Sequence, residues 1–258
     1  MVLRMKIGVQ FFTLRDHCTT LEGLESSMKK VADMGFQHIQ LSGVCQYEAE
    51  WMAEKLKELG LICDITHYSY DKIVNETAST IAFHDTIGCK WIGIGSGPCG
   101  FSPEALPAMK ERTHGAMKQI AASGHKFMYH NHHMEFARFD GKTFLDLLCE
   151  TFTPEECGIT LDTYWVQAGG GDPAWWLRNL KGRVDCIHFK DMVYSPIEKG
   201  VRMAPIGMGN MNYPEILRAC DDADVQYAFI EQDNCYGEDP FACLKQSYTY
   251  LKAQGMNF

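Results

Sequence analysis

The chain has 258 residues, of which 46% are hydrophobic and 22% are charged, and its formal net charge is −9. This balance is typical of a soluble globular protein that buries a sizeable core, and the length suits one large α/β domain or two small ones. The net negative charge, with lysines and arginines scattered along the chain, argues against a nucleic-acid partner. Proteins that bind the phosphate backbone usually carry a basic surface.

The cysteines and the apolar runs indicate a cellular compartment. Eleven cysteines are spread singly along the chain and contain no CxxC pair. An odd, dispersed set of this kind is typical of reduced thiols in the cytoplasm. The apolar run in MVLRMKIGVQFF is too short for a signal peptide, and no run approaches the length of a membrane span. We therefore expect a cytoplasmic protein that has no membrane partner.

Strand and helix patterns alternate along the whole sequence. Strands are predicted at residues 6–12, 38–42, 61–66, 90–96, at the start of 126–136, and at 158–162, 185–190 and 227–231. Helices are predicted at residues 20–34, 48–59, 71–86, 103–122, 142–150, 173–180, 213–220 and 240–254. Eight alternations with short connections predict an α/β fold, a closed (β/α)₈ TIM barrel forming a single domain over residues 1–258. A doubly wound open sheet is the alternative, but no GxGxxG follows the first strand.

The fifth predicted strand opens the segment KFMYHNHHMEF at residues 126–136. Bulky apolar residues lead directly into His130, His132 and His133, and Glu135 follows closely. Such groups are costly to bury without partners, so they require hydrogen bonds, solvent or a metal. A histidine-rich surface loop is one interpretation. The position at the end of an apolar strand favours a functional site, because sites in barrels are commonly built there.

Other predicted strands also end in polar residues. If the barrel forms, their carboxyl ends converge on one mouth. The residues concerned are Gln10, His67, His130, His132, Asp162, His188, Lys190, Glu231 and Asp233. A lone His67 is as often structural, whereas acids and imidazoles that end four successive strands are hard to assign to packing alone. A set without thiolates suits Mn²⁺, Zn²⁺, Co²⁺ or Mg²⁺.

Several motifs together resemble the xylose-isomerase-like TIM barrel family of sugar phosphate isomerases and epimerases. They are GVQFFTLRD, YHNHHMEF, LDTYW, HFKDM, the turn Gly207-Met208-Gly209 and IEQD. The resemblance covers nearly the whole chain. It implies a divalent metal held by Glu, Asp, His and Glu at strand ends, and Asp162, His188 and Glu231 match three of these positions directly.

The remaining glutamate is where the chain departs from the family. Many members have the triplet ENH in the fifth strand, and the aligned residues here are His130-Asn131-His132. Either Glu135 supplies the missing carboxylate or a histidine takes its place. We predict Glu135 as the ligand, because this choice restores the two-carboxylate set and leaves the imidazoles for proton transfer. The departure also affects the expected reaction, since the isomerases of the family use paired glutamates as acid and base.

The resemblance and the residues together predict a metal-dependent enzyme that acts on a sugar or sugar phosphate. Isomerisation or epimerisation, by proton abstraction next to a carbonyl, is the leading reaction. A lyase or dehydratase acting on a keto-inositol or a 3-oxo-glycoside is the alternative. His132, His130 and His67 are candidate catalytic residues, Glu231 is an alternative base, and Lys190 is expected to contact the substrate.

Two other classes of protein have less support. A DNA-repair endonuclease shares this barrel, but it needs several metals and a basic groove, and the net charge of −9 argues against it. A metal-free binding or structural protein would contain no divalent ion. The expected partner is a small sugar or polyol, and a homo-oligomer is compatible with the sequence.

Overall fold

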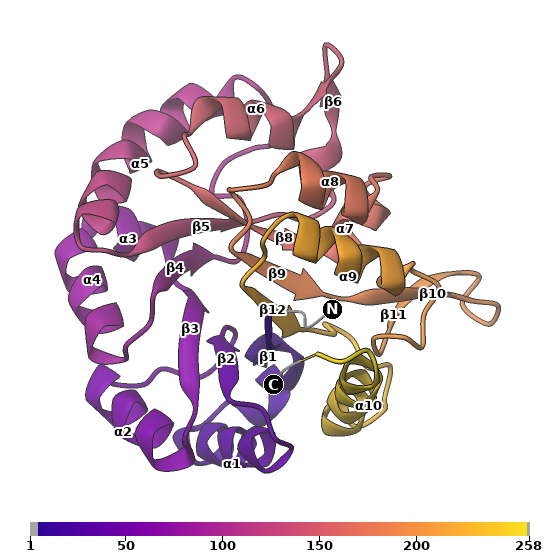
Figure 1. Ribbon diagram of the computed structural model, residues 1–258. Coiled ribbons are helices and arrows are strands. Elements are labelled where there is room, and N and C mark those ends of the chain that lie inside the picture. The colour runs from indigo at the N-terminus through magenta and orange to yellow at the C-terminus, as the bar shows by residue number, and fades with distance from the viewer. Residues whose placement is uncertain (1–4, 257–258) are drawn as a thin grey trace.

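Eight parallel strands close into a barrel in the computed structural model, which describes residues 5–256 (Figure 1). In spatial order they are β1 (Lys6–Gln10), β12 (Tyr227–Ile230), β9 (Cys186–Phe189), β8 (Gly158–Asp162), β5 (Lys126–His130), β4 (Trp91–Ile94), β3 (Ile62–His67) and β2 (His38–Leu41). The first and last strands pair in parallel, with Lys6 opposite Tyr227. The predicted TIM barrel is confirmed, and the outermost residues of the predicted domain, 1–4 and 257–258, lie outside the described range.

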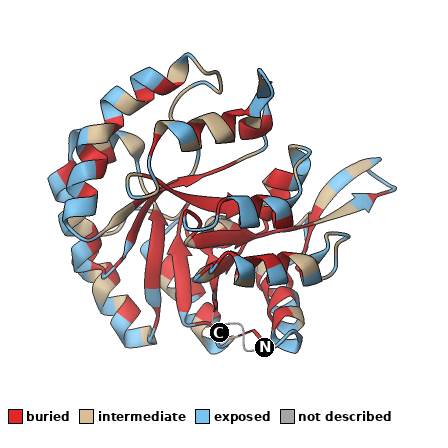
Figure 2. Ribbon diagram, turned by 45° about the horizontal axis from the view of Figure 1, so that its top comes forward, coloured by how far each residue is buried: buried red, intermediate tan, exposed pale blue. Residues whose placement is uncertain are grey.

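Helices form the outer layer of the barrel (Figure 1). They are α1 (Leu21–Asp33), α2 (Ala49–Leu59), α3 (Tyr70–Asn75), α4 (Thr77–Thr86), α5 (Ala105–Ala122), α6 (Phe144–Thr151), α7 (Thr163–Ala168), α8 (Pro173–Asn179), α9 (Tyr213–Asp222) and α10 (Pro240–Ala253). Local sequence sets their ends: Thr20 accepts a hydrogen bond from the backbone of Gly23, and Pro173 begins α8 after the cap Asp172. Figure 2 shows the barrel strands largely buried and the outer helix faces exposed. Among the described residues, none of the helices has the length and apolar composition to cross a membrane.

Some local elements differ from the sequence predictions. The helix predicted at 71–86 is two helices, α3 and α4, because the backbone at Glu76 leaves the helical region with a φ of −131°. Short elements that the pattern did not indicate are the 3₁₀-helices η1 (Phe11–His17) and η2 (Met134–Phe136), helix α7, and the strand pairs β6 (Arg138–Phe139) with β7 (Lys142–Thr143) and β10 (Asp191–Ser195) with β11 (Gly200–Ala204). The β10–β11 hairpin projects away from the barrel (Figure 1).

The interior of the barrel is apolar below its mouth. A layer of buried side chains from five strands, Ile65, Trp91, Met128, Cys186 and Phe229, packs together there. Side chains two residues apart on a strand point to the same face. The inward-facing positions that follow this layer are therefore His67, His130, His188 and Glu231, together with Gly93, which has no side chain. Strand periodicity thus places an apolar floor beneath a polar mouth.

Candidate metal centre

Four buried side chains meet at the carboxyl ends of β5, β8, β9 and β12. They are His130, Asp162, His188 and Glu231, and one potential ligand atom from each lies within 4.8 Å of all the others. Asp162 Oδ2 is 3.2 Å from His130 Nε2 and 3.6 Å from His188 Nδ1. Glu231 Oε2 is 2.9 Å from His188 Nδ1. Two imidazoles and two carboxylates at this spacing suit a divalent transition metal.

Hydrogen bonds to the His130 and His188 rings determine which nitrogen of each ring carries the proton. His130 Nδ1 lies 3.0 Å from the carbonyl oxygen of Gly95, and His188 Nε2 lies 2.7 Å from Gln40 Oε1. Both oxygens only accept, so these nitrogens carry the protons and the inner nitrogens present lone pairs to the carboxylates. Lone pairs that face carboxylate oxygens repel unless a positive charge lies between them. This orientation is typical of metal-binding histidines, and the residues fit a divalent ion.

The electrostatics of His188 also draw positive charge to the cluster. Burial by itself would lower the pKa of His188, but Glu231 and Asp162 outweigh it and raise that pKa above its ordinary value. Either a proton or a metal ion would supply the positive charge that these carboxylates favour.

Lys190 adds a fifth side chain, a positively charged one, to the four of the cluster. Its side chain is 1% exposed, and Nζ lies 3.1 Å from Asp162 Oδ2, 3.0 Å from Glu231 Oε2 and 2.7 Å from Asp233 Oδ1. Burial opposes the charged form, but the three carboxylates more than offset it and raise the pKa of Lys190. Burial would likewise raise the pKa of Asp162, but the Lys190 charge and the nearby histidines hold it well below the usual range.

Two further imidazoles line the mouth beside the cluster. The His67 ring lies 5.2 Å from the His130 ring, and the His132 ring lies 4.7 Å from it on another side. Burial, with the charge of His130 next in size, lowers the pKa of His132 to about 3 and that of His67 well below its ordinary value. Both imidazoles are therefore neutral near pH 7. His132 Nδ1 is buried and has no hydrogen-bond partner in the described part of the chain.

Glu135, which the sequence predicted as a ligand, lies outside this cluster. It sits on η2, where its Oε1 accepts a 2.8 Å hydrogen bond from the Tyr129 hydroxyl and its Oε2 accepts a 2.9 Å bond from the backbone N–H of His132. Both carboxylate oxygens of Glu135 therefore stabilise the turn that follows β5. His130, which the sequence assigned to catalysis, takes the place among the grouped ligand atoms that Glu135 was expected to fill.

Sequence reasoning missed Gln40, which orients His188. Gln40 is fully buried on β2 and lies opposite Gln10 of β1 in the parallel register. Gln10 was predicted at a strand end facing the mouth. Parallel pairing sets Gln40 opposite Gln10, so this pairing is the signal that could have identified Gln40. Asp233 was recognised, but its ion pair with Lys190 was not predicted.

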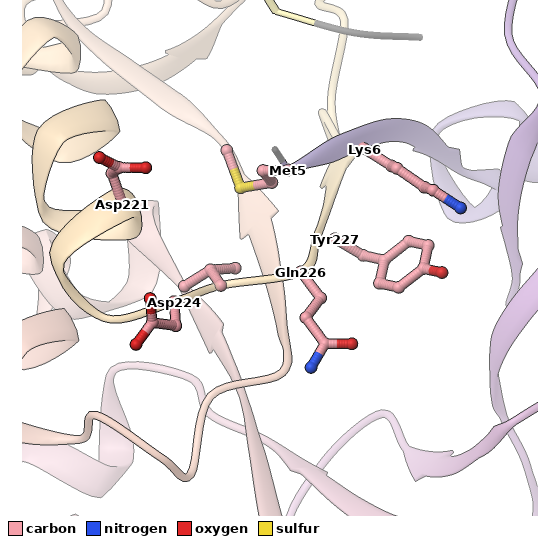
Figure 3. Close-up of a pocket in the computed structure, with 7 residues that line it drawn as sticks. Met5, Lys6, Asp221, Asp224, Gln226 and Tyr227 are labelled. Carbon is pink, nitrogen blue, oxygen red and sulfur yellow. The ribbon is translucent and has the colours of Figure 1, made fainter. Parts of the chain in front are cut away.

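Open space adjoins the cluster on two sides. A cleft of about 350 Å³ includes His67, Ser42 and Lys72, and another of about 230 Å³ includes Asp233 and Arg15. A hollow of about 400 Å³, lined by Lys6, Asp221, Asp224 and Tyr227 among others, lies where β1 and β12 begin (Figure 3). That is the amino end of the barrel strands, opposite the cluster. Residues at this end of a TIM barrel stabilise the fold, and active sites form at the other end.

The fold and the site define a TIM barrel with a candidate metal centre at the carboxyl ends of its strands. The sequence matches the family model of the xylose isomerase-like TIM barrel over residues 28–252. The chain belongs to this family. None of the curated proteins matches the chain.

Solved structures share the fold at low sequence identity. A sugar phosphate isomerase/epimerase from Parabacteroides distasonis ATCC 8503 has a TM-score of 0.80 and 22% identity, covering 96% of this chain and 98% of that chain. A probable 3-DHS dehydratase from Bacillus anthracis has a TM-score of 0.72 and 18% identity, with 96% and 99% covered. The IOLI protein, solved with a zinc atom, has a TM-score of 0.71 and 13% identity, with 97% and 98% covered. At these identities the likeness establishes the fold alone.

Proposed function

We propose that this chain is a divalent-metal-dependent isomerase or epimerase of a sugar or sugar phosphate. The observation that supports it most is the buried group His130, Asp162, His188 and Glu231, whose inner imidazole nitrogens face carboxylate oxygens. When bound there, a divalent ion would act as a Lewis acid that polarises a substrate carbonyl. The similarity to a sugar phosphate isomerase/epimerase supports the same reaction class.

The residues of the chain would then move the proton. His132 Nδ1 is buried and has no hydrogen-bond partner among the described residues, so it is a candidate to accept the proton from the carbon next to the carbonyl. Return of that proton to the former carbonyl carbon, with the hydroxyl proton moving to the other oxygen, gives isomerisation. Epimerisation requires that a second group deliver a proton to the opposite face of the same carbon. The low pKa of His132 keeps it unprotonated but makes it a weak base. Glu231 is the alternative group for this step; burial would raise its pKa, but Lys190 and His188 hold that pKa below its ordinary value, so it too is ionised.

A lyase or dehydratase reaction is the second candidate. The imidazoles of His67 and His132 each lie in ring contact with the His130 imidazole. They offer more than one route for a proton to reach a β-leaving group. The likeness to a probable dehydratase supports this alternative. Release of the leaving group from 3-oxo-glycosides or keto-inositols would favour it over isomerisation.

Exchange with deuterated water tests the proposed function. The protein is loaded in turn with Mn²⁺, Co²⁺, Zn²⁺ or Mg²⁺ and incubated with a panel of ketoses and their phosphates, and proton NMR follows the carbon next to the carbonyl. We expect deuterium to enter that carbon, and chelation or Asp162→Asn to abolish the exchange. Asp185→Asn is the matched control, because Asp185 pairs with Lys126 next to the amino end of β9. Exchange that persists after chelation and in Asp162→Asn would contradict the proposal.

A further inference from the structure

Lys190 is a buried cation that contacts the same oxygen atoms as the proposed metal centre. Its Nζ is 3.1 Å from Asp162 Oδ2, the oxygen that also faces His130 and His188. The same Nζ is 3.0 Å from Glu231 Oε2, the oxygen that faces His188 Nδ1. An ion bound to these two oxygens would therefore have the ammonium as its immediate neighbour.

Three carboxylate oxygens surround the Lys190 ammonium at ion-pair distance. All three lie within 3.1 Å of Nζ, the closest being Asp233 Oδ1 at 2.7 Å. The charge of Lys190 is therefore directed at carboxylates, whereas the sequence predicted a contact with substrate.

A divalent ion would balance the charges of the cluster. Asp162, Glu231 and Asp233 face Lys190, so with all three carboxylates ionised and the imidazoles neutral the group carries a net charge of −2. Without the ammonium, three carboxylates would stand together in a largely buried site with no positive side chain among them. Uncompensated buried charge of this kind is strongly destabilising.

We propose that Lys190 is a tethered cation that holds Asp162 and Glu231 together in the metal-free protein and weakens metal binding by sharing their oxygens. This inference rests on the metal centre of the proposed function. It makes Lys190 a positioning residue. The wild-type protein should then stay folded without metal and should take up and release the ion without unfolding, because the ammonium stabilises the empty site.

The variant Lys190→Met tests this role, with Lys126→Met as the matched control. Lys126 is a partly buried lysine whose Nζ pairs with Asp185 at 2.6 Å, near the amino ends of the strands. Thermal unfolding is measured in chelator and in excess Mn²⁺ or Zn²⁺, and the metal Kd is measured by competition with a coloured chelator. Neither readout depends on activity.

We expect Lys190→Met in chelator to unfold about 10 °C below the wild type, because two buried carboxylates and the partly buried Asp233 lose their counter-charge. Metal should restore most of this loss, and the Kd should tighten by about tenfold or more, since a like charge next to the ion is removed. Lys126→Met should show the wild-type metal shift and Kd. A Lys190→Met protein with the wild-type Kd and the wild-type metal shift would overturn the proposal.

The remaining outcomes are also decisive. If Lys190→Met does not fold in chelator, the same unfolding and Kd measurements are made on the double variant Lys190→Met/Asp233→Asn, which has one carboxylate charge fewer. Failure of both variants to fold in saturating metal would refute the proposal, because the ion should replace the ammonium charge. A wild type that binds no ion while Lys190→Met does would refute the metal dependence of the proposed function and support the role of Lys190. Absence of binding in both would refute the two together.

Discussion

The variants Glu135→Gln and His130→Ala test whether Glu135 stabilises the fold and His130 binds the metal. Glu135 accepts hydrogen bonds from the Tyr129 hydroxyl at 2.8 Å and from the His132 N–H at 2.9 Å, and it is fully buried. Glu135→Gln keeps the shape but removes one acceptor oxygen and the charge. Because one buried hydrogen bond is weakened or lost, we expect the free energy of unfolding to fall by about 1–3 kcal/mol. Metal content should stay at the wild-type level.

His130→Ala should have the complementary effect. It removes one of the four grouped ligand atoms, so the metal Kd should weaken by at least the roughly tenfold to hundredfold seen when only the outer partners of ligands are lost. Urea unfolding in chelator gives the stability of each variant, and elemental analysis after dialysis gives its metal content. If Glu135→Gln loses the ion while His130→Ala retains it, the assignment of His130 to the metal centre is wrong and the ligand predicted from the sequence is restored.

Three further predictions concern other residues. His84 is buried, with Nε2 bonded to Thr66 Oγ1, and burial lowers its pKa from 6.5 to about 4. The unfolded chain therefore binds more protons between these pH values, so stability should fall by about 3 kcal/mol as pH drops from 6.5 to 4. Urea unfolding across this range should show a weaker pH dependence for His84→Gln, and an unchanged slope would contradict the cause given. Gln40→Leu, which removes the acceptor of His188 Nε2, should weaken the metal Kd about tenfold to hundredfold. Gln40→Glu keeps an acceptor oxygen, so its metal Kd should stay near the wild-type value. Wild-type affinity in Gln40→Leu would exclude an orienting role for Gln40. His132→Ala should slow deuterium exchange into substrate by about a hundredfold, and exchange at the wild-type rate in His132→Ala but not in Glu231→Gln would assign the proton to Glu231.

Local sequence patterns were sufficient for the barrel, and the resemblance to the family selected three of the proposed ligands from the strand-end residues. Apolar runs, helical periodicity and glycine stops are short-range signals, and they located the strands of the barrel closely. Once the barrel was inferred, Asp162, His188 and Glu231 could be placed at one mouth, because parallel strands that close into a barrel bring their carboxyl ends together. The prediction was less accurate at Glu76, where one predicted helix is two.

Only the tertiary structure decided which of the strand-end groups meet. The choice between His130 and Glu135 depends on the turn after β5, which folds the Glu135 carboxylate back onto Tyr129. The ion pairs of Lys190 link β8 and the segments that follow β9 and β12, and the bond between Gln40 and His188 joins residues 148 positions apart. Such contacts depend on strand register and side-chain rotamers across the barrel, and sequence spacing along one strand carries no information about either.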